Sequence, residues 1–141
     1  MSVSDKYGYR LGSRIPQNLK VDASTTVPIE VGDMLTLASA GYVKRASAGD
    51  NVIAVAMSRL DTAPSSDGEA TILADISDQS IYAYPGASAA SQAKAFLTCD
   101  VGGARSIDET ASTDDVLLIV GVDTANSLYL VKLKPTYAGV I

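Results

Sequence analysis

Residues 30–57, EVGDMLTLASAGYVKRASAGDNVIAVAM, decide the fold. Three short apolar segments within them, at 34–37, 42–45 and 52–56, are separated by turns rich in Gly, Asp and Asn. These turn residues tolerate the positive φ of tight reversals, and the β-branched residues between them suit a half-buried pleated surface. A chain that reverses roughly every eight residues is not a helical bundle and is typical of a small β-barrel or sandwich.

The same pattern continues along the rest of the chain. Further strands are predicted at 69–76, 80–84, 93–99, 105–107, 116–122 and 128–134, with a turn at 101–104. The apolar run VLLIVGV at 116–122 is expected to be a central strand. Residues 87–95, ASAASQAKA, could form one short helix capped by Ser88 or Ser91, or a loop of small residues. The prediction is a mainly all-β fold, a small barrel or sandwich of short antiparallel strands with at most one short helix.

The bulk composition indicates one globular domain preceded by an arm. The chain has 141 residues, of which 47% are hydrophobic and 19% charged, enough for a single packed core. We expect this β domain to span residues 25–141. Residues 1–24 differ, because Gly8, Gly12 and Pro16 interrupt any regular period. They are interpreted as an extended N-terminal arm; the alternative is that they fold back as an edge strand of the same domain.

The arm has the composition of an interface. Tyr and Arg, the residue types that anchor interfaces, alternate in it with aliphatic side chains. The candidate partner-binding residues, contacting either a partner surface or a neighbouring subunit, are Tyr7, Tyr9, Arg10, Leu11, Arg14 and Ile15. The arm also carries an excess of positive charge, whereas the rest of the chain is acidic. This asymmetry suggests that the arm meets something negative, or else that it is a solvated tail.

The charge balance argues against nucleic acid as a partner. The formal net charge is -5 and the pI about 4.5, whereas a duplex-binding protein needs a basic face to displace counterions. No stretch approaches the length of an apolar membrane span, and the beginning of the sequence lacks the apolar block of a signal peptide. We therefore expect a protein made in the cytoplasm, without a membrane partner.

The sequence offers little catalytic chemistry. It contains no His, and its one cysteine, Cys99, lies in an apolar run that favours a core position. Paired carboxylates occur at Asp75 with Asp78, Asp108 with Glu109, and Asp114 with Asp115. They are expected to be solvated in turns and loops, although a calcium site within 108–115 stays open. We expect no enzyme, no cofactor and no metal site.

A weak internal repeat links two parts of the chain. Residues 34–63 and 96–125 share Leu-Thr, a Gly turn and Asp-Thr-Ala in the same ungapped alignment. The order of strand, turn, strand, polar loop and apolar strand recurs in both. Duplicated strand units are common in β-barrels, but a low-complexity composition also produces such matches.

Residues 29–57 contain Gly32-Asp33 before an apolar strand, then Gly41-Tyr42-Val43, and then Ala46 followed by Ala54-Val55-Ala56. This pattern resembles the small β proteins that decorate the heads of tailed bacteriophages. It covers residues 27–134, with Ile53 standing where those sequences have Gly.

The resemblance implies a capsid decoration, or cement, protein. Such a protein would bind the outer surface of the head as a homotrimer, stabilise contacts between major capsid protein subunits, and be located on the virion after assembly in the host cytoplasm. The arm would then contact the shell or a neighbouring copy. The competing interpretation is a carbohydrate- or ligand-binding β module of a viral fibre or appendage. Tyr82 and Tyr84, which share one face of a strand, are its nearest aromatic pair; core packing or a subunit interface is the alternative for them.

Overall fold

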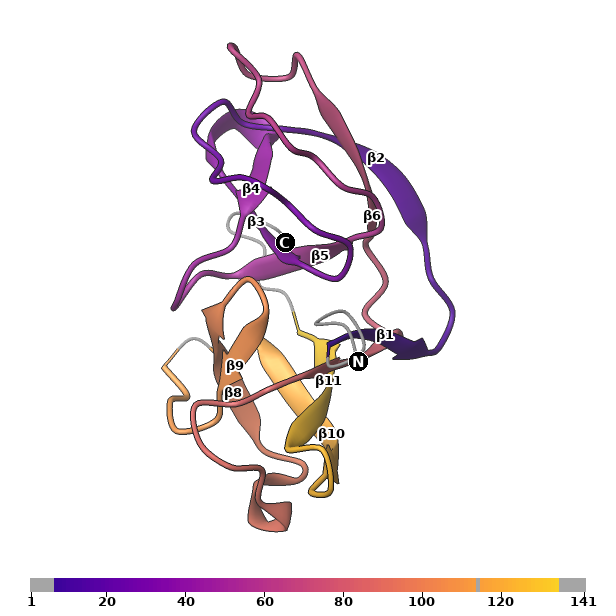
Figure 1. Ribbon diagram of the computed structural model, residues 1–141, viewed down its shortest axis with the longest axis vertical. Helices are drawn as coiled ribbons and strands as arrows, with labels where there is room; N and C mark the ends of the chain where they lie inside the picture. Colours follow the sequence, from indigo (N-terminus) through magenta and orange to yellow (C-terminus); the bar gives the residue numbers. More distant parts are fainter. Residues whose placement is uncertain (1–6, 114, 135–141) are drawn as a thin grey trace, which may run out of the picture.

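The computed structural model describes residues 7–113 and 115–134 and consists mainly of β-strands. Its strands form two antiparallel sheets, which occupy the upper and lower halves of Figure 1. The all-β sandwich expected from the sequence is therefore confirmed. For the described residues, the only helical elements are two short 3-10 turns, η2 at Ser39–Gly41 and η3 at Gln92–Lys94.

The upper sheet has five strands, and the hairpins of residues 30–57 form the side of it that ends at the edge strand β4. Its order across the sheet is β2 (Pro16–Lys20), β6 (Thr71–Asp75), β5 (Val52–Ala56), β3 (Met34–Leu37) and β4 (Val43–Arg45). The strands predicted at 34–37, 42–45 and 52–56 are thus present, because the Gly and Asp turns between them set the reversals.

The lower sheet has six strands, and the apolar run at 116–122 lies inside it as predicted. The order is β1 (Gly8–Leu11), β7 (Ile81–Tyr84), β11 (Leu128–Leu133), β10 (Leu117–Asp123), β8 (Thr98–Gly103) and β9 (Ser106–Asp108). The turn predicted at 101–104 is misplaced, because β8 continues through both glycines to Gly103.

The small-residue segment 87–95 is a loop, not a helix, apart from the η3 turn that Ser91 caps. Side chains from other segments bind its amides. Glu109 accepts hydrogen bonds from the Ala87 and Ser88 amides, and the Tyr129 hydroxyl accepts one from the Ser91 amide at 2.9 Å. The high helix propensity of Ala is therefore overridden by tertiary contacts.

The described part of the expected arm folds back onto the domain. β1 pairs with β7 and β2 pairs with β6, so each becomes an edge strand of one sheet (Figure 1). The segment therefore folds back as an edge strand, which was the alternative to an extended arm, and it does so in both sheets. Residues 1–6 of the arm lie outside the described residues.

Two clusters of buried side chains form the core. One fills the space between the sheets and includes Tyr82, Tyr84 and Tyr129; the other covers the far face of the upper sheet around Leu35 and Ile72. Tyr82 and Tyr84 share a face with ring centroids 6.3 Å apart, and both are buried, as the core alternative predicted. Cys99 is fully buried in the same cluster.

The two sheets repeat one strand order. In chain order, β2 to β6 and β7 to β11 are each arranged first, fifth, fourth, second, third across their sheet. β1 then adds to the edge at β7. The sequence repeat thus corresponds to a duplicated topology, although equivalent strands begin at 34 and 98 or at 52 and 117, which is not the spacing of the ungapped alignment.

Candidate interaction surface

Three of the six candidate arm residues pack within the molecule. Tyr7 is 7% exposed and stacks on Tyr84 with the ring centroids 6.2 Å apart. Tyr9 meets Tyr82 edge to face at 5.8 Å, and the Arg14 guanidinium lies 3.5 Å from the Tyr9 ring centroid. Burial raises the pKa of the Tyr7 hydroxyl, helped by Asp33. These side chains hold the edge strand to the core.

The other three candidates lie at the surface. Leu11 is 57% exposed and Ile15 49% exposed, and the Arg10 side chain is also exposed, near the Gly8 and Tyr9 carbonyls. Large aliphatic side chains held outward on an edge strand are candidates for partner contact.

The turn between β1 and β2 fixes where Leu11 and Ile15 point. Gly12 has φ +104°, and a Cβ at this position would lie 2.6 Å from the Gln79 carbonyl oxygen. The Ser80 hydroxyl donates to the Ser13 carbonyl at 3.3 Å. The Ile15 amide donates to the Asp75 carboxylate at 2.9 Å, and its carbonyl accepts from the Ile76 amide at 3.0 Å. The turn is therefore bound along its length to residues 75–80.

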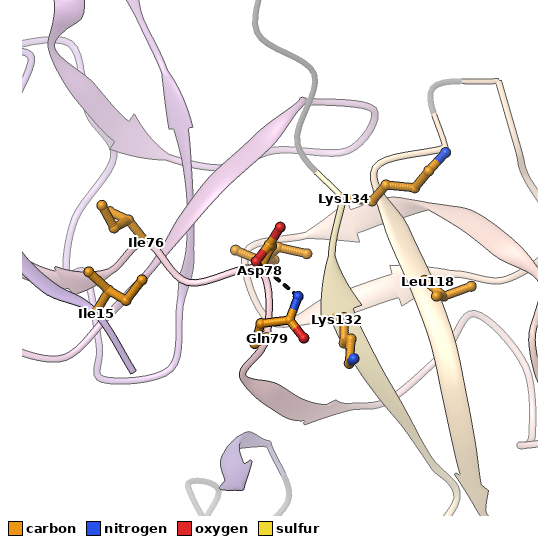
Figure 2. Close-up of a pocket in the computed structure, with 8 residues that line it drawn as sticks. Ile15, Ile76, Asp78, Gln79, Leu118, Lys132 and Lys134 are labelled. Atoms are coloured by element: carbon orange, nitrogen blue, oxygen red, sulfur yellow. Dashed lines mark hydrogen bonds between the residues drawn. The ribbon is translucent and has the colours of Figure 1, made fainter. Parts of the chain in front are cut away.

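A pocket of about 590 Å³ lies beside this turn and is lined by residues from the sides of both sheets, and we call it the inter-sheet pocket (Figure 2). Ile15 and Ile76 come from the side of the upper sheet, and Leu118 from β10 of the lower sheet. Its lining residues are Ile15, Ile76, Asp78, Gln79, Leu118, Lys132, Leu133 and Lys134. The aliphatic half of this lining, Ile15, Ile76, Leu118 and Leu133, can contact an apolar group.

Both signs of charge line the inter-sheet pocket. Asp78 accepts a hydrogen bond from the Gln79 side-chain amide at 3.1 Å, and Lys132 and Lys134 lie on the side of the lower sheet (Figure 2). The pocket can therefore discriminate the orientation of a charged partner.

A second exposed apolar feature precedes β8. Phe96 is 76% exposed and Leu97 is exposed beside it. Phe96 has φ +68°, and its amide donates to the Ile119 carbonyl at 2.7 Å. The strand predicted at 93–99 is wrong for Phe96, because β8 begins only at Thr98; the signal in the sequence that could have marked this residue is that it is the only Phe of the chain.

The buried carboxylates serve the fold. Asp33 is fully buried and pairs with Arg45 at 3.2 Å and Arg105 at 2.6 Å. The expectation that the paired acids are all solvated is wrong for Asp75 and Glu109, which are buried and accept hydrogen bonds from amides of other segments.

Asp75 accepts hydrogen bonds from several segments of the chain. Besides the amides of Ile15 and Ser77, it accepts the Tyr82 hydroxyl at 2.6 Å. Burial by itself would raise the pKa of the Asp75 carboxyl. The hydrogen bonds from Tyr82, Ser80, Ile15 and Ser77 outweigh it and hold the pKa below the ordinary value. The burial of Tyr82 and the nearby Asp75 carboxylate both raise the pKa of the Tyr82 hydroxyl.

The remaining chemistry is consistent with these structural roles. Burial, reinforced by Asp100 and Glu109, raises the pKa of the Cys99 thiol to about 12. Within residues 7–113 and 115–134, no group of three His, Cys, Asp or Glu side chains is placed to hold a metal ion. Asp114 of the possible calcium loop lies outside the described residues. No helix in the described part of the chain is long and apolar enough to cross a bilayer.

Comparisons with known proteins identify no relative. A scan against protein-family models, a search of curated proteins and a search of solved structures each found no match.

Proposed function

We propose that this chain is a structural virion protein, a capsid decoration protein that binds the outer surface of a phage head as a homotrimer and stabilises contacts between major capsid protein subunits. The observation that carries the proposal is the exposed apolar surface formed by Leu11, Ile15 and the inter-sheet pocket on a tightly bonded β-sandwich. Exposed aliphatic groups on a rigid scaffold lose little conformational entropy on binding, so they are well suited to a permanent contact.

The internal bonding supports a mechanical role. Asp33 ties the sheets together through Arg105, and Asp75 ties the turn before β2 to the core through the Ile15 amide. A protein that bridges neighbouring shell subunits has to resist shear between its own layers. Buried, fully hydrogen-bonded charges serve that purpose because breaking one of them is costly.

Leu11 is the proposed contact with the shell. It stands outward on β1, next to Arg10, at the edge of the lower sheet. An acidic shell surface would complement Arg10, while Leu11 would be buried between the two proteins.

Co-sedimentation with purified heads that lack the protein tests this proposal. The wild-type chain should pellet with heads in a fixed ratio to the shell subunit. Leu11→Asp should weaken this binding by at least ten-fold. Leu37→Asp, which changes an exposed leucine on β3 of the upper sheet, is the matched control and should bind normally. Absence of wild-type binding to any head would overturn the proposal.

The second candidate is a ligand-binding β module, and the inter-sheet pocket favours it. Its volume lies within the range of small-molecule sites. A carbohydrate usually stacks on exposed aromatic rings, however, and Tyr82 and Tyr84 are buried. A monomer that binds a glycan or small molecule, with binding lost in Leu118→Asp, would favour this function over decoration.

A further inference from the structure

Phe96 is held outward at a conformational cost. For a bulky L-residue, φ +68° is an outlier that persists only where the surrounding structure imposes it. The imposing contacts are both on β10: the Phe96 amide donates to the Ile119 carbonyl at 2.7 Å, and the Ile119 amide donates to the Leu97 carbonyl at 3.0 Å. The fold thus maintains a strained backbone whose effect is to present an aromatic ring to solvent.

Such a ring is the type of group that anchors protein interfaces. Aromatic side chains that enter a pocket contribute a large share of binding energy, whereas an unused exposed Phe favours aggregation. Lys94 lies two residues before Phe96, and Asp115 accepts the hydroxyl of Thr98, two residues after Phe96, at 2.8 Å. The chain on one side of Phe96 therefore carries a cation, and the chain on the other side binds an anion.

We propose that Phe96 of one copy inserts into the inter-sheet pocket of a neighbouring copy, and that this contact builds the homo-oligomer on which the proposed function rests. The receptor is present on the same chain. Ile15, Ile76 and Leu118 offer aliphatic walls, and a pocket of about 590 Å³ has room for a phenyl ring. Phe96 is not among the residues that line the pocket of its own chain.

The charges around the ring and the pocket are complementary. Lys94 can face Asp78 of the neighbour, while Asp115 can face Lys132. This pairing operates in one orientation of the ring in the pocket, because reversing it would bring like charges together. Charge pairing of this kind sets the register of an interface more than its strength.

The Phe96 ring and the inter-sheet pocket are two different surfaces attached to one strand. Leu118 lines the pocket and the neighbouring Ile119 holds Phe96, so the ring and the receptor are both fastened to β10. When one surface of a protein fits a different surface of its neighbour, repetition of the contact produces a ring if the rotation closes. A trimeric ring would give each copy one filled pocket and one inserted ring.

Phe96→Gly is the decisive substitution. Gly adopts a positive φ without strain, so this variant should keep or raise the melting temperature while its self-association weakens by at least ten-fold. A residue that merely supported the fold would lower the melting temperature instead. The mass measured by light scattering after size exclusion should fall from an oligomer to a monomer. Leu37→Gly, at an exposed leucine remote from both features, should retain the oligomer.

A mixed cross-linking experiment tests the contact itself. A Leu97→Cys chain and a Gln79→Cys chain, both of which keep Phe96 and the aliphatic walls of the pocket, are mixed in equal amounts with a short bis-maleimide and should yield a cross-linked dimer of the two different chains. Neither chain alone should yield it, because Cys99 is buried. A monomeric wild-type protein, or an absent mixed cross-link, would overturn the proposal.

The outcomes separate this proposal from the proposed function. If Phe96→Gly keeps its oligomeric mass but no longer binds heads, Phe96 contacts the shell and the copy-to-copy contact is wrong, whereas the decoration function stands. If the wild-type protein is an oligomer that Phe96→Gly dissociates, yet never binds heads, the contact stands and the decoration function fails.

Discussion

The Asp33 carboxylate and the Arg105 guanidinium join the two sheets. Asp33 immediately precedes β3 of the upper sheet, and Arg105 lies in the turn between β8 and β9 of the lower one. Two hydrogen bonds link them, Nε to Oδ1 at 2.6 Å and Nη2 to Oδ2 at 3.1 Å. Arg45 also donates to Asp33 at 3.2 Å, so two cations share one buried anion. Bidentate pairs of this kind fix geometry as well as adding energy.

Removal of the Asp33 charge should therefore destabilise the whole sandwich. Asp33→Asn leaves two guanidinium groups with weakened partners, and we expect the free energy of unfolding to fall by about 3–5 kcal/mol. Urea denaturation measures it. Asp61→Asn, which breaks the exposed pair with Arg59, is the control and should cost less than about 1 kcal/mol. Equal losses in the two variants would show that Asp33 does not couple the sheets.

Asp75 should make the stability depend on acid. Its pKa in the folded state is lower than the ordinary value of 3.8, so its contribution is fully present above pH 3.8 and is lost as the pH falls through the lower folded value. The free energy of unfolding should therefore decrease steeply below about pH 4. Asp75→Asn should flatten this decrease, whereas Asp78→Asn, at an exposed carboxylate, should not. An unchanged slope in Asp75→Asn would contradict the assignment.

The Cys99 thiol should be inert in the native protein. Its pKa of about 12 leaves almost no thiolate at pH 8, and the side chain is fully buried. We expect no measurable reaction with iodoacetamide over an hour in native buffer, and complete reaction in urea. Mass spectrometry measures both. Rapid native alkylation would mean that β8 opens readily or that the thiol is accessible.

Gly12 should be hard to replace. In Gly12→Ala the new Cβ meets the Gln79 carbonyl oxygen at 2.6 Å, and φ +104° strains any L-residue. The expected loss is about 1–3 kcal/mol of unfolding free energy, from strain and displaced backbone. Gly41→Ala is a matched control, because φ is +85° there but nothing lies within 4 Å of the added carbon. Gly41→Ala should therefore lower the free energy of unfolding only through the strain of the positive φ, by about 1 kcal/mol.

The strands that local signals define could be predicted from the sequence. β3 lies between turns of Gly, Asp or Asn, and such turns also precede β5 and β11, where they specify a reversal whatever the rest of the chain does. β1 and β2 carry no such signal. Their partners β7 and β6 lie far along the chain, so an edge strand and a free arm have the same local appearance.

The features of the candidate surface depend on distant contacts in the same way. The composition of the N-terminal segment indicates Ile15 as a candidate for partner contact. The pocket that Ile15 lines also requires Leu118, which comes from the lower sheet. Phe96 follows an Ala-rich segment, and its outward position arises from hydrogen bonds to Ile119. The burial of Glu109 likewise follows from its role as acceptor for the Ala87 amide. No periodicity in the sequence encodes these pairings.

The duplicated strand order has a consequence for the origin of the molecule. A half-chain with the arrangement of β2 to β6 would expose one face of its sheet and could cover it by pairing with an identical half-chain. Fusion of two such genes would place both halves of that symmetric dimer in one chain. Divergence after the fusion would account for the present differences, in which β1 adds to the sheet of β7 to β11 whereas β2 remains an edge strand of the other sheet.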